Sequence, residues 1–82
     1  MLRIHAVRCV GERFVALGLT DGTSRVVDLT PLMQGSVFEP LLADDARFRE
    51  VRVDAVLGTI VWPNGADLDP EVLLGHERAA SI

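Results

Sequence analysis

The sequence predicts a small α+β domain in which a mainly antiparallel sheet carries short helices. Three observations lead to this class. The N-terminal third alternates apolar and polar residues between turn-forming dipeptides. Prolines and glycines break up the middle, and the C-terminal third holds two short apolar runs followed by a helix-start pattern. Because 82 residues provide one core, we predict a single domain over residues 1–82, with a flexible tail over residues 75–82.

The N-terminal part is predicted to be a three-stranded antiparallel meander over Ile4–Val10, Phe14–Thr20 and Ser24–Leu29. Asp21-Gly22 separates the second and third strands, and this dipeptide favours a tight hairpin because glycine accepts positive φ. Alternation places one set of apolar side chains on a common face of the second strand: Val15, Leu17 and Leu19.

The middle of the chain predicts separate helical turns rather than one long helix. Thr30 suits a cap and Pro31 the first helical position of a turn that Gly35 ends. Pro40 is expected to break any longer helix across this segment, and Asp44 to cap a second short helix. Four apolar residues are the expected anchors onto the sheet: Phe38, Leu41, Leu42 and Phe48.

The C-terminal part predicts a hairpin of Val51–Asp54 and Thr59–Trp62, followed by a corner and a short helix. A turn over residues 63–65 follows from a proline, an asparagine and a glycine in order. Asp69 is a strong N-cap candidate for a helix over Pro70–Leu74, because proline is well suited to the first helical position.

Composition narrows the classes of function. The formal net charge is −4 and lysine is absent, so direct nucleic-acid binding is not expected and a basic protein partner fits better. No apolar run is long enough to span a membrane, and the N-terminus shows no secretory pattern. With Cys9 as the single cysteine, no internal disulfide can form, and we expect a cytoplasmic protein.

An acidic run, Asp67, Asp69 and Glu71, follows the only tryptophan, Trp62. Hard oxygen ligands in such a run could bind a divalent cation, or the carboxylates could do acid–base chemistry. Turn and cap chemistry explains each acid equally well: Asp69 accepts backbone N–H groups, Asp67 closes the turn, and Glu71 lies favourably in the helix dipole. We favour the second interpretation.

Trp62 itself is either a core residue, which we favour, or an interaction hot spot. The predicted partner or ligand surface comprises Trp62, Asn64, Asp67 and Phe38. His5 and Cys9 lie roughly 13 Å apart along a strand, too far to share one zinc ion. The sequence has no nucleophile elbow and no phosphate-binding loop, so we assign no catalytic, cofactor or metal residues and expect no cofactor.

Three segments resemble a known family: LTDGTSRVVDLTPLM, VFEPL and GTIVWPNGADLDPEVL. Together they are similar to the bacterial domain of unknown function 2442 family (DUF2442), and the resemblance runs from about Leu17 to Leu74. It implies an α+β module with a mainly antiparallel sheet and carries over no activity, cofactor or site residue. Some members look like neighbours of small toxin-like proteins, which implies a toxin-like protein partner and an antitoxin role by analogy.

Three functions follow as hypotheses. The first is a non-catalytic protein-interaction module, antitoxin-like or regulatory. The second is a ligand-sensing module with a pocket beside Trp62, Asp67 and Phe38. The third, which we favour least, is an enzyme that uses the acids near Trp62. A homodimer is also expected to be feasible, because a small sheet has edges that need shielding.

Overall fold

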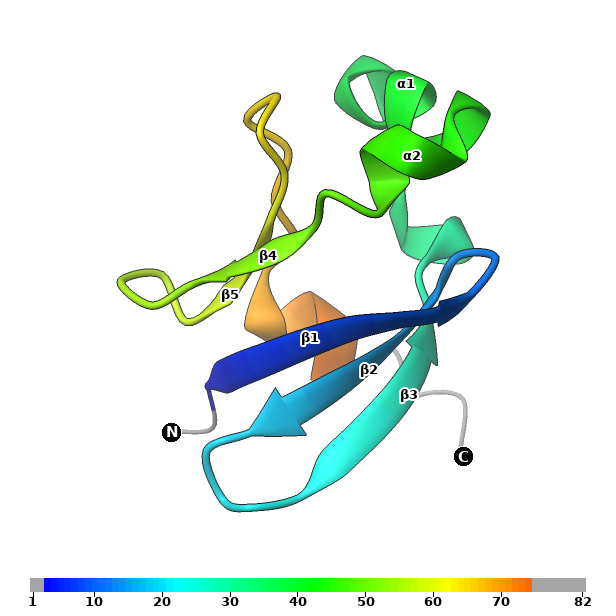
Figure 1. The fold of residues 1–82 in the computed structure, drawn as a ribbon. Helices are drawn as coiled ribbons and strands as arrows, with labels where there is room; N and C mark the ends of the chain where they lie inside the picture. The colour runs from blue at the N-terminus through cyan, green and yellow to red at the C-terminus, as the bar shows by residue number, and fades with distance from the viewer. Residues whose placement is uncertain (1–2, 75–82) are drawn as a thin grey trace.

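The computed structural model describes residues 3–74 and consists of two antiparallel sheets joined by short helical turns (Figure 1). The first sheet has the order β1-β2-β3, with β1 at Ile4–Gly11, β2 at Phe14–Leu19 and β3 at Ser24–Asp28. The second is the hairpin of β4, Arg52–Asp54, and β5, Thr59–Val61. The predicted α+β class, meander and C-terminal hairpin are confirmed.

The register of the first sheet separates its two faces. Val15 pairs with Cys9 on one side and with Val27 on the other, and these side chains point into the core. The predicted inward face of β2 is confirmed, because Val15, Leu17 and Leu19 are all fully buried. At the β2–β3 turn Gly22 has φ +88°, the left-handed conformation that makes glycine suitable there.

The segment between the two sheets differs in detail from the predicted turns. Its elements are η1 (Thr30–Leu32), η2 (Ser36–Phe38), α1 (Glu39–Ala43) and α2 (Asp45–Phe48). Asp44 caps α2 as expected, since its carboxylate accepts the N–H of Ala46 at 3.0 Å.

Four expectations in this segment are wrong. Thr30 does not cap η1; it donates its own N–H to the Asp28 carboxylate at 3.0 Å. Gly35 does not end that turn, because η1 finishes at Leu32 and Gly35 precedes η2. Pro40 lies in the first turn of α1, where no N–H is needed, so the break falls at the extended Asp44 instead. Leu42 is 37% exposed, while the other three expected anchors are buried.

The β4–β5 hairpin lies beside the first sheet and is tied to its outer strand. The N–H of Ile4 donates to the carbonyl of Gly58 at 3.0 Å. The Arg3 guanidinium then donates through Nη2 to the carbonyls of Ala55 at 3.1 Å and Val56 at 2.8 Å. These bonds hold the connecting turn of the hairpin against the start of β1.

After β5 the chain turns and enters a helix that spans residues 70–74 of the described part. Asp69 caps it as predicted, because its carboxylate accepts the N–H of Glu71 at 2.7 Å. Leu68 and Leu73 are buried in the same core cluster, on either side of the helix start. The predicted flexible tail, residues 75–82, lies outside the described residues, and no helix in residues 3–74 is long and apolar enough to cross a membrane.

Candidate functional site

Trp62 lies at the centre of the core, with only 2% of its surface exposed. Its indole Nε1 donates a hydrogen bond of 2.9 Å to the backbone carbonyl of Phe48 at the end of α2. Phe38 meets the indole edge to face, with ring centroids 5.8 Å apart, and Phe48 lies tilted at 6.0 Å. The favoured interpretation of Trp62 as a core residue is confirmed.

Arg13, in the turn between β1 and β2, packs against the same aromatic cluster. Its guanidinium carbon lies 4.8 Å from the centroid of the Phe48 ring, which is cation–π geometry. Nη2 donates to the carbonyl of Leu42 at 2.8 Å, and Nη1 pairs with the Asp45 carboxylate at 3.0 Å. Arg13 therefore joins the β1–β2 turn to both short helices.

Asn64 organises the corner that follows Trp62. Its side-chain oxygen accepts the N–H of Ala66 at 3.1 Å, and its Nδ2 donates to the carbonyl of Val37 at 2.9 Å. Asn64, and not Asp67, is thus the side chain that closes this turn. The expectation for Asp67 is wrong because only its backbone takes part, through a bridge to Val61.

A shallow pocket of about 190 Å³ lies between the β4–β5 hairpin and the start of helix 70–74. Asp67 and Asp69 both line it, and six residues contribute in all: Leu57, Thr59, Asp67, Leu68, Asp69 and Pro70. The Asp69 carboxylate is occupied by its N-cap bond. Within residues 3–74 the Asp67 carboxylate makes no hydrogen bond and no ion pair, so the two acids have different roles.

The four residues of the predicted partner or ligand surface do not form one surface. Trp62 and Phe38 are buried against each other, Asn64 is exposed but occupied at its turn, and Asp67 alone lines the pocket. Phe38 and Trp62 pack edge to face and are both buried, so neither side chain offers an open surface to a ligand.

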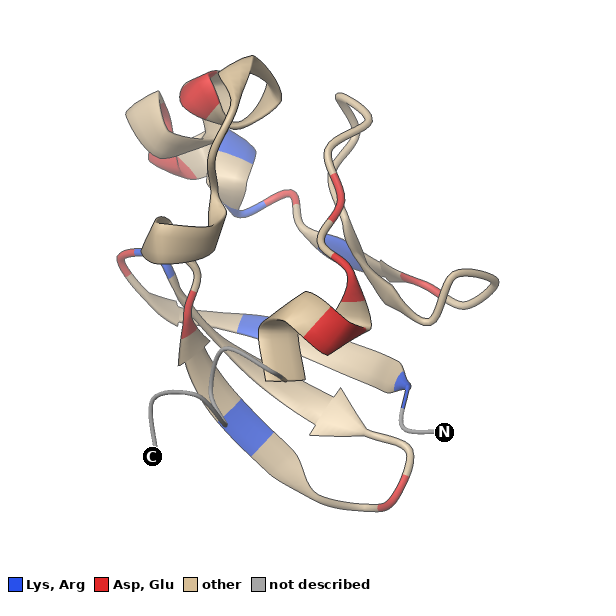
Figure 2. Cartoon of the chain, turned by 180° about the vertical axis from the view of Figure 1, so that it is seen from behind, with Lys and Arg blue, Asp and Glu red and all other residues tan. Residues whose placement is uncertain are grey.

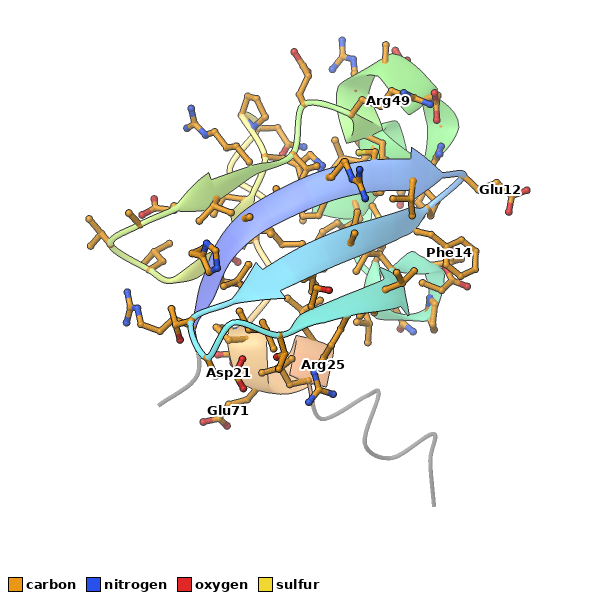
Figure 3. The ribbon with its side chains drawn as sticks, turned by 60° about the horizontal axis from the view of Figure 1, so that its bottom comes forward. Glu12, Phe14, Asp21, Arg25, Arg49 and Glu71 are labelled. Carbon is orange, nitrogen blue, oxygen red and sulfur yellow. The ribbon has the colours of Figure 1, made fainter. Side chains whose placement is uncertain are left out.

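The first sheet instead presents an uncovered face on the side away from the core. Cross-strand rows place small and apolar side chains there, together with the charged residues Arg8 and Asp28. In Figure 3 the three strands lie in front of the other elements of the described chain. Val26 is 60% exposed at the edge strand, and Val10 and Phe14 are also exposed. We define the outer face as Ala6, Arg8, Val10, Phe14, Ala16, Gly18, Ser24, Val26 and Asp28.

Comparison with family profiles gives one informative result. Residues 4–79 match the family described as "Protein of unknown function (DUF2442)", which is nearly the whole chain. The chain belongs to the DUF2442 family. Comparison with curated proteins gives no match, and comparison with solved structures gives none either. The predicted family is confirmed, while its description assigns no activity to this DUF2442 protein.

Two further side chains, Cys9 and His5, are of types that can bind a metal ion. Cys9 is partly buried against the core, and this burial raises the pKa of its thiol from 9.0. His5 is exposed, and its ring lies beside Gly18 on the face of the sheet opposite to Cys9. It lies there because an irregularity in β1 shifts the register between Ile4 and Ala6. No three metal-ligating side chains gather within the part of the chain that the structure describes.

Two features of this site were not anticipated from the sequence. The role of Arg13 depends on contacts 29 and 32 residues away along the chain, so no local signal announces it. The outer face could have been found from the sequence. Phe14 and Val26 alternate with the buried residues of their strands, so their side chains point to the opposite face of the sheet. Apolar residues on both parities predict a strand with two apolar faces, of which only one meets the core here.

Proposed function

We propose that this DUF2442 protein is a non-catalytic protein-interaction module and that its outer face is the contact surface. The observation that carries the proposal is the exposure of Val26 on a sheet whose opposite face already packs a complete core. Clustered apolar side chains on an exposed, rigid face are typical of recognition surfaces. A three-stranded hydrogen-bonded sheet also presents such a surface with little ordering cost on binding.

The acidic side chains support a non-catalytic role. Asp44, Asp54 and Asp69 each accept backbone N–H bonds, which is the role expected of caps and turns. Capping uses these carboxylates where a catalytic site would leave them facing a substrate.

The size of the outer face favours one kind of partner. The three strands have eight, six and five residues, and at a spacing of about 4.8 Å they give a footprint on the order of 300 Å². A stable two-fold dimer needs roughly 800 Å² from each copy. A second copy on this face alone would be held weakly, so we assign the face to a different protein that reaches beyond its border. A toxin-like partner, and with it an antitoxin role, is the specific form that family analogy supports.

A charge placed on the outer face tests the proposal. The variant Val26→Lys inserts a cation at its most exposed apolar position, and Val37→Lys makes the same change at a 41% exposed position on η2, away from the sheet. We expect a stoichiometric protein to co-purify from the native host with the wild type and with Val37→Lys, and to be lost with Val26→Lys.

Two results would contradict the proposal. One is a partner retained equally by all three proteins, which would place the contact elsewhere. The other is sedimentation showing that the wild type self-associates at micromolar concentration and that Val26→Lys abolishes this, which would make a second copy the occupant. Circular dichroism of each variant verifies that the fold is intact.

A further inference from the structure

The turn of the β4–β5 hairpin is an exposed apolar knob. Val56 is 87% exposed and Leu57 is exposed beside it. The turn is nevertheless rigid, because the Asp54 carboxylate accepts the N–H groups of both residues at 2.9 and 3.1 Å. The Arg3 guanidinium bonds two of the turn carbonyls from the other side, including that of Val56. Apolar side chains presented on a rigid turn lose little entropy when a partner binds them.

The pocket described above begins at this knob. Leu57 forms part of its wall, and Leu68 and Pro70 supply the rest of its apolar surface. Asp67 and Asp69 line the same small space. An exposed apolar turn and an acidic pocket therefore share one side chain, Leu57, and form one continuous surface.

This surface carries negative charge that the described chain does not neutralise. The Asp67 carboxylate has no hydrogen-bond or ion-pair partner in residues 3–74, and Glu71, four residues further along the chain, is exposed. Acidic positions follow one another from the exit of β5 into helix 70–74 in Figure 2. Arg3 bonds the turn of this hairpin, and its Nη2 is engaged by carbonyls.

We propose that the hairpin turn and the pocket form a docking site for a basic segment of a protein partner. An arginine of that segment enters the pocket and pairs with the Asp67 carboxylate, while an adjacent apolar residue packs on Val56 and Leu57. Arginine fits better than lysine, because its planar fork can bond both carboxylate oxygens and its weaker hydration suits a partly apolar wall. The site does not depend on the outer face, which lies on the other sheet.

The test adds a capped tripeptide, acetyl-Leu-Arg-Leu-amide, to the full chain. Binding is measured from the changes in the chemical shifts of the protein's backbone amides. Acetyl-Leu-Gln-Leu-amide serves as the uncharged probe. Asp67→Asn removes the charge without removing a structural bond among the described residues. Asp21→Asn is the matched control, because it neutralises an exposed acid in the β2–β3 turn, on the first sheet.

We expect the arginine peptide to shift Leu57, Asp67 and Leu68 in the wild type and in Asp21→Asn. Asp67→Asn should bind it about threefold to tenfold more weakly, as expected for a charge-assisted pair that is partly exposed. Equal binding to Asp67→Asn, equal binding of both peptides, or shifts spread over all acids would overturn the proposal. Val26→Lys should leave these shifts unchanged, so a failure here is distinguishable from a failure of the outer-face proposal.

Discussion

The indole of Trp62 and the backbone carbonyl of Phe48 form a buried hydrogen bond of 2.9 Å that joins the corner after β5 to the end of α2. The two residues also pack their rings at 6.0 Å. A short helix of four residues has little stability of its own, so this contact fixes where α2 ends relative to the second sheet. The corner in turn places Asp67 at the pocket, since only four residues lie between it and Trp62.

Replacing Trp62 by phenylalanine should lower the free energy of unfolding by about 2–4 kcal/mol. The change leaves the Phe48 carbonyl buried without its donor and removes part of a fully packed side chain. Urea unfolding followed by far-UV circular dichroism measures this, because the variant has no tryptophan. Phe14→Leu on the outer face is the control and should stay within about 0.5 kcal/mol of the wild type. Equal losses for the two variants would contradict the role of Trp62.

Arg13→Lys should cost about 1–2 kcal/mol of stability although the charge is kept. Lysine cannot reach the Leu42 carbonyl and the Asp45 carboxylate with one planar group, nor stack on Phe48 in the same way. Arg47→Lys is the control, because that pair with Asp44 is exposed and 3.6 Å long, and we expect no measurable change. A loss as large in Arg47→Lys would show that arginine content alone matters.

Stability should fall on the acid side below about pH 4. Hydrogen bonds from Arg49 hold the pKa of Asp45 below its ordinary value of 3.8, and Arg13 adds to this. A depressed pKa in the folded state means that the stabilisation is present above pH 3.8 and is lost as pH falls through the folded pKa. Urea midpoints between pH 2.5 and pH 6 measure the slope, with intervals of about half a pH unit. Asp45→Asn should make the urea midpoint depend less steeply on pH. An unchanged slope would show that other titratable groups cause the loss of stability in acid.

Gly58→Ala should destabilise the hairpin by about 2 kcal/mol. Gly58 has φ +69°, and an added Cβ would meet the Arg3 Cζ at 2.6 Å, so Arg3 must leave the carbonyls that it bonds. In an Arg3→Ala background the same change should cost only the backbone strain, about 1 kcal/mol. A cycle of the four proteins by urea unfolding measures the coupling between the two residues. Strict additivity would exclude the inferred contact.

Cys9 should react slowly with a disulfide reagent at neutral pH. Burial raises the pKa of the thiol, so the thiolate fraction in the folded protein is smaller than in an unfolded chain. The rate in buffer and the rate in denaturing urea, measured at one pH, provide the comparison. A folded rate that matches or exceeds the unfolded rate would show that Cys9 is an activated thiol.

The sequence by itself determined the local features of this protein. Alternation in Phe14–Leu19 defined a strand and its buried face, and the glycine after Asp21 defined the hairpin turn. Asp44 and Asp69 were recognisable as caps, because capping needs only a side-chain oxygen two or three residues before the N–H that it accepts. Such signals are readable because the interacting groups are close along the chain.

Only the tertiary structure decided which surfaces are left for function. Trp62 and Phe38 were grouped with Asp67 as one surface from their residue types, yet packing buries the first two and leaves the third at a pocket. Arg13 meets Asp45 and Leu42 only because the β1–β2 turn folds over the short helices. Burial depends on what a distant part of the chain covers, and non-local contacts of this kind leave no pattern in the sequence around either partner.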